Sequence, residues 1–138
     1  MAFHVDPSRE GFAAFAKSAF EGPINMLNLL KFRDKAAYED GTKATGAEAY
    51  GVYGKVAAPL FAKAGGTVVW RGAALAGLVG PSDKVWDGGF IAAYPNKEAF
   101  LSMVMDPEYQ AIVHHRTAAI LDSRLYAFGP YDGEALFG

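Results

Sequence analysis

The residues best suited to chemistry lie in the last predicted helix, where Arg116 shares a mostly apolar stripe. The other members of the stripe lie three or four positions apart on the same helical face: Tyr109, Val113 and Ile120. A buried guanidinium costs several kcal/mol unless it is paired. Asp87, Asp122 or a bound anionic group would provide the partner. Arg116 is therefore either part of a structural ion pair or the anchor for an organic acid. The ion pair is favoured, because ion pairs are commoner than binding sites.

His115 stands beside Arg116 and is the second candidate for a catalytic role. An imidazole titrates near neutrality, which suits a side chain that moves a proton to or from a bound molecule. A helical histidine serves more often as a hydrogen-bonding spacer, and this alternative stays open. Neighbouring helical positions point about 100° apart, so His114 and His115 do not readily chelate one ion. We therefore predict no metal site and no cofactor.

A second set of candidates would line a small-molecule pocket. Tyr50 and Tyr53 lie one turn apart on a predicted helix. The predicted strands add three more aromatic side chains: Trp70, Trp86 and Tyr94. Aromatic walls with a few polar tips suit a planar or apolar ligand, although core packing is the simpler interpretation of any single aromatic. Asn28 interrupts an apolar strand, so its amide needs partners from the backbone or a ligand. The predicted ligand-binding residues are Asn28, Tyr50, Tyr53, Trp86 and Tyr109.

Composition and missing motifs exclude several classes of protein. The formal net charge is -2, and no basic run exists that would follow a nucleic-acid backbone. The longest uncharged apolar stretch near the middle, residues 72–79, is too short to span a bilayer, and charges interrupt any N-terminal secretory signal. The sequence has no cysteine, which suits a cytoplasmic location. The glycine motifs of dinucleotide and P-loop sites do not occur, nor do the serine and zinc motifs of hydrolases.

The elements that position these residues follow from hydrophobic periodicity and turn chemistry. A helix over residues 7–21 begins at an Asp-Pro pair and ends before a Gly-Pro pair. The predicted core elements are a strand at 24–33, a helix at 45–64, a hairpin of strands at 67–79 and 85–94, helical pieces at 97–105 and 107–121, and a strand at 123–128. We expect one α+β domain over residues 1–138, with a ferredoxin-like βαββαβ core at 24–128 and a tail at 129–138.

The first strand carries apolar residues in both of its alternating sets, so both faces of the sheet need cover. The two main helices of a ferredoxin-like core cover only one face, and the first and third strands lie in the centre. An apolar face of that size rarely stays exposed on a soluble protein, and a twofold partner is the usual cover. We therefore expect a homodimer, with the two sheets face to face as a dimeric α+β barrel. The alternative is that the N-terminal helix or the C-terminal tail covers this face.

Four segments together resemble one known family. They are MLNLLKF (26–32), TGAEAYGVYG (45–54), WDGGFIAAYPNKEAF (86–100) and DPEYQAIVHHRTAAILDSRL (106–125). Their combination of Trp-Asp, Tyr-Pro, Asp-Pro-x-Tyr and a later His-Arg is similar to the domain-of-unknown-function family thirteen-thirty, within the dimeric α+β barrel superfamily. The resemblance covers residues 24–128 and implies the fold and the dimer, but no activity. Superfamily relatives include cofactor-independent monooxygenases, haem-degrading enzymes and muconolactone isomerase-like proteins.

Three functions are consistent with these features. The first is an enzyme that uses neither metal nor nucleotide and acts on a small organic acid or aromatic molecule, with Arg116 holding the acid and His115 moving a proton. The second is a non-catalytic dimer, either small-molecule-binding or stress-related, in which His115 lies away from the cavity. The third, haem handling, rests on superfamily analogy alone. For all three we expect no nucleic-acid partner and no membrane partner.

Overall fold

The computed structural model describes residues 2–82 and 85–130 of the chain. In chain order these residues form α1 (Arg9–Lys17), β1 (Ile24–Phe32), α2 (Gly46–Lys63), β2 (Thr67–Ala73), β3 (Gly88–Tyr94), α3 (Lys97–Met105), α4 (Pro107–Gln110), α5 (His114–Ala119) and β4 (Ile120–Phe128). Two predicted turn residues, Asp83 and Lys84, lie outside the described residues, as does the predicted tail beyond residue 130.

The strands form an antiparallel sheet in the order β2-β3-β1-β4. β1 and β3 occupy its centre, which confirms their predicted position. Asn28, near the middle of β1, lies opposite Phe90 on one side and Leu125 on the other. The βαββαβ order after α1, combined with this sheet, is the ferredoxin-like fold, so the predicted fold class is confirmed.

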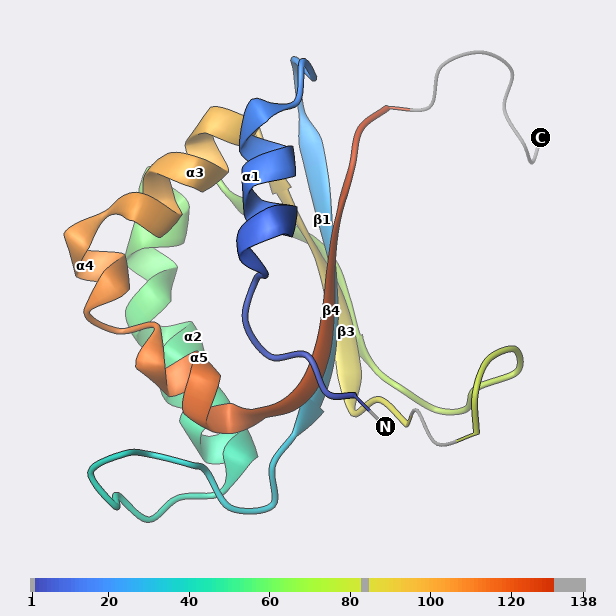
Figure 1. The fold of residues 1–138 in the computed structure, drawn as a ribbon, viewed down its shortest axis with the longest axis vertical. Helices are drawn as coiled ribbons and strands as arrows, with labels where there is room; N and C mark the ends of the chain where they lie inside the picture. The colour runs from blue at the N-terminus through green and yellow to red at the C-terminus, as the bar shows by residue number, and fades with distance from the viewer. Residues whose placement is uncertain (1, 83–84, 131–138) are drawn as a thin grey trace.

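The labelled helices lie together on one face of the sheet, and α1 belongs to this helical layer (Figure 1). The alternative that the N-terminal helix covers the opposite face is therefore wrong. α1 packs beside α3, where the rings of Phe15 and Phe100 meet edge to face with their centroids 5.7 Å apart. At the start of α3, Lys97 Nζ donates hydrogen bonds to the carbonyl oxygens of Ala16 and Ser18, at the end of α1. These contacts hold α1 on the helical side.

The core lies between the helices and the inner side of the sheet. In β1 every second residue from Ile24 to Leu30 is buried, because strand side chains alternate between the two faces. One buried cluster combines strand and helix residues near α3 and α4: Ile24, Met26, Leu60, Ala92, Tyr94, Phe100, Met103 and Tyr109. A second cluster joins β1 to the N-terminal part of α2 and the end of α5: Leu30, Ala49, Ala119 and Ile120.

The opposite side of the sheet, which we call the open face, is also apolar. Its large apolar side chains come from every strand: Leu27, Leu29, Trp70, Ile91, Tyr126 and Phe128. Strand pairing sets one row across it, from Trp70 through Ile91 and Leu27 to Tyr126. Trp70 is 55% exposed and Tyr126 is 57% exposed. The described chain therefore leaves a continuous apolar row only partly covered.

A β-bulge in β2 decides which of its side chains reach the open face. Val68 pairs with Ala92 and Trp70 pairs with Ile91, so Val69 is an extra residue in the strand. In a regular strand that included Val69 in the pairing, two-residue alternation would point Val68 and Trp70 to the same side. The bulge instead turns Trp70 to the open face and Arg71 to the helical side.

Some element boundaries differ from the predicted ones. The hairpin strands are shorter than expected, and the described residues between them form a loop in which Leu75, Leu78 and Val79 are more than nine-tenths exposed. The last predicted helix is divided at residues 111–113 into α4 and α5, and β4 begins at Ile120 rather than 123. The loop after β1 ends α5 there, since backbone N–H groups of that loop bind the last carbonyl groups of α5. α1 ends at Lys17 rather than residue 21.

Candidate functional site

A cavity of about 700 Å³ lies between the helical layer and the inner side of the sheet. This volume is within the range of about 300–1,000 Å³ that small-molecule sites occupy. The sheet supplies the floor with Asn28, Phe90 and Leu125, and α2 supplies one wall with Tyr50 and Tyr53. Further walls come from α3, α4, α5 and the segment around α1. The cavity is therefore enclosed by the sheet on one side and by the helical layer on the other.

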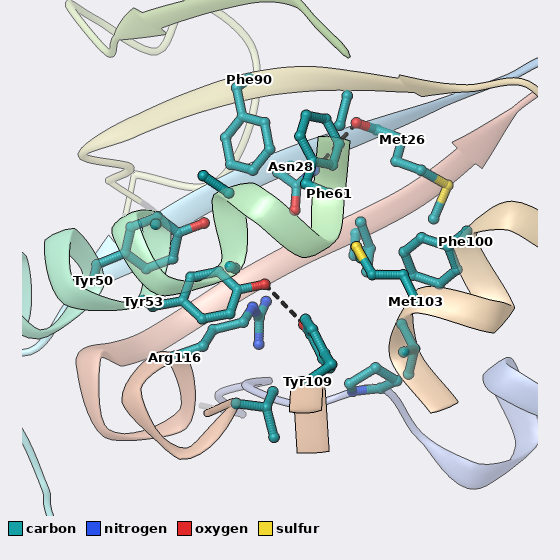
Figure 2. Close-up of a pocket in the computed structure, with 18 of the residues that line it drawn as sticks. Met26, Asn28, Tyr50, Tyr53, Phe61, Phe90, Phe100, Met103, Tyr109 and Arg116 are labelled. Atoms are coloured by element: carbon teal, nitrogen blue, oxygen red, sulfur yellow. Dashed lines mark hydrogen bonds between the residues drawn. The ribbon is translucent and has the colours of Figure 1, made fainter. Parts of the chain in front are cut away.

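One end of the cavity is polar (Figure 2). Tyr50 and Tyr53 bring their hydroxyl groups to this end from α2, and Arg116 reaches it from α5. The hydroxyl oxygens of Tyr53 and Tyr109 are 2.8 Å apart and share a hydrogen bond. The rings of Tyr50 and Tyr53 also touch, with centroids 5.3 Å apart. The structure thus brings together four of the residues that the sequence singles out.

Arg116 is nearly buried, with a side chain that is 9% exposed. Its Nη1 donates a hydrogen bond of 2.7 Å to Val5 O, and Asp6 Oδ1 lies 3.8 Å from the same nitrogen, beyond hydrogen-bond distance. A guanidinium has five N–H donors. Among the described residues, the hydrogen bond of Arg116 comes from Nη1 alone. Arg116 therefore keeps unused donor groups at the polar end of the cavity.

The carboxylate beside Arg116 is not one that the sequence suggests. Asp87 forms its ion pair with Lys31 at 3.3 Å and caps a backbone N–H at the end of β1. Asp122 pairs with Arg124 at 2.8 Å. Asp6, on the segment before α1, approaches Arg116 instead, because that segment folds back along β4 through hydrogen bonds between His4 and Ser123.

Asn28 is buried on the cavity floor at 7% exposure. Its Nδ2 donates a hydrogen bond of 3.1 Å to Met26 O, two residues earlier on the same strand. Its Oδ1 receives no hydrogen bond from the described residues, and Figure 2 shows the carbonyl oxygen turned away from Met26 into the cavity. Asn28 therefore offers an acceptor that faces whatever occupies the cavity.

The other end of the cavity is apolar (Figure 2). Met26, Phe61, Phe100 and Met103 line it, and Tyr94 contacts both phenylalanines edge to face. Methionine side chains are flexible and polarizable, so they adapt to ligands of different outline. This end suits an apolar body, whereas the opposite end suits an acidic or hydroxyl-bearing group.

Burial keeps the tyrosines of the cavity protonated. Desolvation raises the pKa of Tyr50 to about 12, although the charge of Arg116 acts in the opposite direction. Desolvation and the neighbouring Tyr109 raise the pKa of Tyr53 further. These phenols therefore act as neutral hydrogen-bonding groups at pH 7. Among the described residues, Asp6 is the one carboxylate that lines the cavity, and no histidine lines it.

His115 is not among the lining residues, in contrast to its predicted role beside Arg116. Its Nδ1 lies 2.6 Å from Tyr38 Oη, and its ring stacks on His114 with the centroids 4.1 Å apart. Since adjacent helical positions point in different directions, the turn that sends Arg116 into the cavity sends His115 toward the loop after β1. Burial and the charge of His114 lower the pKa of His115.

Trp86 does not line the cavity either. It precedes β3, so strand alternation does not orient its side chain, and its ring packs against the guanidinium of Arg124 with Cζ 5.2 Å from the ring centroid. Trp70 points to the open face because of the bulge in β2. Of the three strand aromatics in the predicted pocket, Tyr94 is the one that lines it.

Two parts of the cavity wall are missing from the sequence-based set. Arg71 lines it from edge strand β2, where it is exposed, and the bulge that turns it inward has no signal in the pattern of residue types. The segment before and within α1 contributes Asp6, Pro7 and Phe12. The amphipathic pattern of α1 indicates a helix laid on the core, but not the side of the sheet on which it lies.

The described residues form neither a metal site nor a membrane-spanning helix. Over residues 2–82 and 85–130 no three side chains of His, Asp or Glu come together as a metal site would require. None of the helices in that part of the chain is long and apolar enough to cross a membrane.

Comparison with known families and structures supports the architecture. The family model described as "Domain of unknown function (DUF1330)" matches residues 29–126. The crystal structure of RPA0582, a protein of unknown function from Rhodopseudomonas palustris, is 48% identical to the chain with a TM-score of 0.89, covering 96% of this chain and 100% of that one. A methylated form of RPA0582 has a TM-score of 0.91 at the same identity, covering 96% of this chain and 98% of that one.

More distant structures share the fold alone. A dabb family protein with a ferredoxin-like fold from Mesorhizobium loti is 15% identical with a TM-score of 0.55, covering 80% of this chain and 98% of that one. SnoaB, a cofactor-independent oxygenase from Streptomyces nogalater, is 18% identical with a TM-score of 0.52, covering 85% of this chain and 99% of that one. A search of curated proteins finds no match.

Proposed function

The chain belongs to the DUF1330 domain-of-unknown-function family, and we propose that it binds a small organic acid with an apolar body in the cavity between the helices and the sheet. One observation carries this proposal: a cavity of about 700 Å³ has Arg116 and tyrosine hydroxyl groups at one end and methionine and phenylalanine side chains at the other. The acid group lies beside Arg116, and the apolar body lies against Met26, Phe100 and Met103.

Binding has more support than catalysis. The enzyme hypothesis needs His115 to move a proton, yet this side chain lies outside the cavity lining and bonds to Tyr38. Tyr50 and Tyr53, which do line the cavity, have raised pKa values, so they are poor general bases near pH 7. Haem handling finds no histidine to hold the iron, because none lines the cavity among the described residues. The hypothesis of a non-catalytic, small-molecule-binding protein needs only the residues that already line the cavity.

The assembly that we propose is a homodimer that pairs two open faces. The row from Trp70 to Tyr126 crosses the whole sheet and is apolar, and a twofold axis through it would bring like residues together. The loop with Leu75, Leu78 and Val79 leaves the sheet on this side (Figure 1) and exposes three large apolar side chains that a second copy would cover. A single domain and a cytoplasmic location remain predictions from the sequence.

A cavity-filling substitution tests the binding proposal. Gly54 lines the cavity from α2, and a Cβ atom added there meets no atom within 4 Å, so Gly54→Leu introduces bulk from a position with free space. Gly51→Leu is the matched control, because Gly51 lies one turn earlier on α2, has the same free space and does not line the cavity. Both changes replace a helical glycine by a better helix former.

The readout is isothermal titration calorimetry with octanoate, an acid with a flexible apolar body. We expect binding at one molecule per chain, weakening by about tenfold or more in Gly54→Leu and little change in Gly51→Leu. Equal octanoate affinity in both variants would contradict a site in this cavity. The absence of octanoate binding to the unmodified protein would contradict the proposed ligand class.

A further inference from the structure

We propose that the head group of the ligand carries a hydroxyl beside its acid group, so that the protein selects 2-hydroxy acids over plain carboxylic acids. This inference rests on the proposed function and adds a second recognition point to it. The acid group contacts donors at the polar end of the cavity, and the hydroxyl donates to Asn28. Three observations lead to it: the state of Asn28, the donors left on Arg116, and the placement of both.

Asn28 offers an acceptor to the ligand. Its Nδ2 already donates to Met26 O, and this hydrogen bond sets the orientation of the amide. The remaining Oδ1 accepts no hydrogen bond from the described residues and is turned into the cavity, on a residue that is 7% exposed. A ligand with an O–H or N–H group can therefore donate to it.

Arg116 and Tyr50 need an acceptor from the ligand. Arg116 Nη1 donates its hydrogen bond to Val5 O. In the described ion pair of Arg116, Asp6 Oδ1 lies 3.8 Å from the same nitrogen. Tyr50 Oη makes no hydrogen bond within the described part of the chain, and its pKa stays high enough to keep the proton. A carboxylate accepts from both groups, and a planar guanidinium matches its two oxygens.

Both sets of groups line one cavity. Figure 2 shows the oxygen of Asn28, the hydroxyl groups of Tyr50 and Tyr53, and the guanidinium of Arg116 turned toward the same end of the cavity. A head group that contacts both sets presents an anionic acceptor and a neutral donor. A hydroxyl on the carbon next to a carboxylate has this arrangement, whereas a plain carboxylate or a 2-oxo acid offers acceptors only and leaves Asn28 Oδ1 unpaired.

Three probes of equal chain length separate these possibilities by calorimetry at pH 7.5: 2-hydroxyoctanoate, octanoate and 2-oxooctanoate. We expect 2-hydroxyoctanoate to bind about threefold to tenfold more tightly than octanoate, which is the range that one net hydrogen bond provides. The affinity of 2-oxooctanoate should be no higher than that of octanoate. The comparison uses the unmodified protein, so it does not depend on whether a variant folds.

A substitution of Asn28 on the cavity floor tests whether this residue causes the preference for 2-hydroxyoctanoate. In Asn28→Leu the acceptor is gone while the side chain keeps the same number and branching of heavy atoms, so the difference between 2-hydroxyoctanoate and octanoate should disappear while octanoate still binds. Asn25→Leu is the control, because Asn25 lies on the same strand, points to the other side of the sheet and is exposed; it should keep the full preference.

The outcomes distinguish the two proposals. If octanoate binds and the hydroxyl adds nothing, or if the preference survives in Asn28→Leu, the hydroxy-acid inference is wrong and the binding site stands. If none of the three probes binds, the proposed function fails, and the inference built on it fails as well.

Discussion

The side chains around the cavity owe their chemical state to burial more than to close ion pairs. Tyr50 and Tyr53 remain protonated because desolvation penalises a phenolate, although Arg116 lies close enough to favour one. Arg116 itself carries a full charge beside a carboxylate that is half-exposed and beyond hydrogen-bond distance. A guanidinium in this state gains from an incoming acid, since the cost of removing it from water has already been met during folding.

His115 gives the protein a pH dependence that is separate from the cavity. Its pKa is lowered in the folded protein by burial and by His114, so between that lowered value and the ordinary value near 6.5 the unfolded chain binds more protons. The contribution of His115 to stability is therefore complete above about pH 6.5 and is lost as the pH falls through the folded-state pKa. His115→Asn should show a smaller loss of Tm between pH 7.5 and 5.5 than the unmodified protein.

Thermal unfolding followed by circular dichroism at several pH values checks this prediction. His4→Gln is the control, because His4 is exposed and lies on another segment. A parallel fall of Tm in the His115 variant and the unmodified protein would mean that other groups produce the whole pH dependence. Octanoate binding should be unchanged in His115→Asn, since His115 does not line the cavity.

Among the elements, α1 has the fewest ties to the rest of the chain. None of its residues is buried, and its main polar anchor is Lys97, whose Nζ donates to Ala16 O at 3.2 Å, to Ser18 O, and toward Ser18 Oγ at 3.4 Å. Lys97 is itself 8% exposed, so these acceptors take the place of water around the ammonium group. The wall that α1 gives to the cavity therefore depends on two side chains of α3, Lys97 and Phe100.

Lys97→Met should loosen α1 without disturbing the sheet. We expect a loss of about 1–3 kcal/mol in the free energy of unfolding, as for other hydrogen bonds to a charged group, and faster hydrogen exchange at the amides of α1. Lys55→Met is the matched control, since Lys55 is exposed on α2 and makes no hydrogen bond in the described residues. Unchanged exchange in α1 would show that Phe15 and Phe100 hold the helix without Lys97.

The sequence predicts well those elements that are regular, together with their site residues. β1 is a short apolar run bounded by turn residues and α2 has a 3.6-residue pattern, and the residues predicted from them, Asn28, Tyr50 and Tyr53, line the cavity. The errors fall where the chain departs from a regular element. Trp86 lies outside a strand, and His115 follows a break between α4 and α5 that a single predicted helix over 107–121 does not contain. Contacts from the far N-terminus, such as Val5 with Arg116, leave no local pattern to read.

At the scale of the whole molecule, the open face is the surface on which the proposed dimer depends. Ile91→Glu places a charge in the central row of this face, where pairing of two sheets would bury it, and we expect the dimer to dissociate about a hundredfold more readily. Sedimentation velocity should give twice the chain mass of 14.7 kDa for the unmodified protein and a single chain for the variant at low micromolar concentration.

Val52→Glu is the control for this prediction. Val52 is an apolar residue that is 43% exposed on α2, in the helical layer away from the open face, so a charge there should leave the dimer intact. A monomeric unmodified protein at high concentration would refute the dimer outright. Dissociation by Val52→Glu and not by Ile91→Glu would move the interface to the helices.

The extra residue in β2 couples two surfaces that otherwise have nothing in common. If β2 kept all its residues but paired as a regular strand, its side chains after Val68 would exchange sides: an indole would enter the cavity, and a cation would emerge among the apolar side chains of the sheet. Ligand choice and subunit pairing would then change together. Loss of Val69 alone would remove the bulge and leave Trp70 and Arg71 on their present sides, so both properties depend on how the strand accommodates its extra residue.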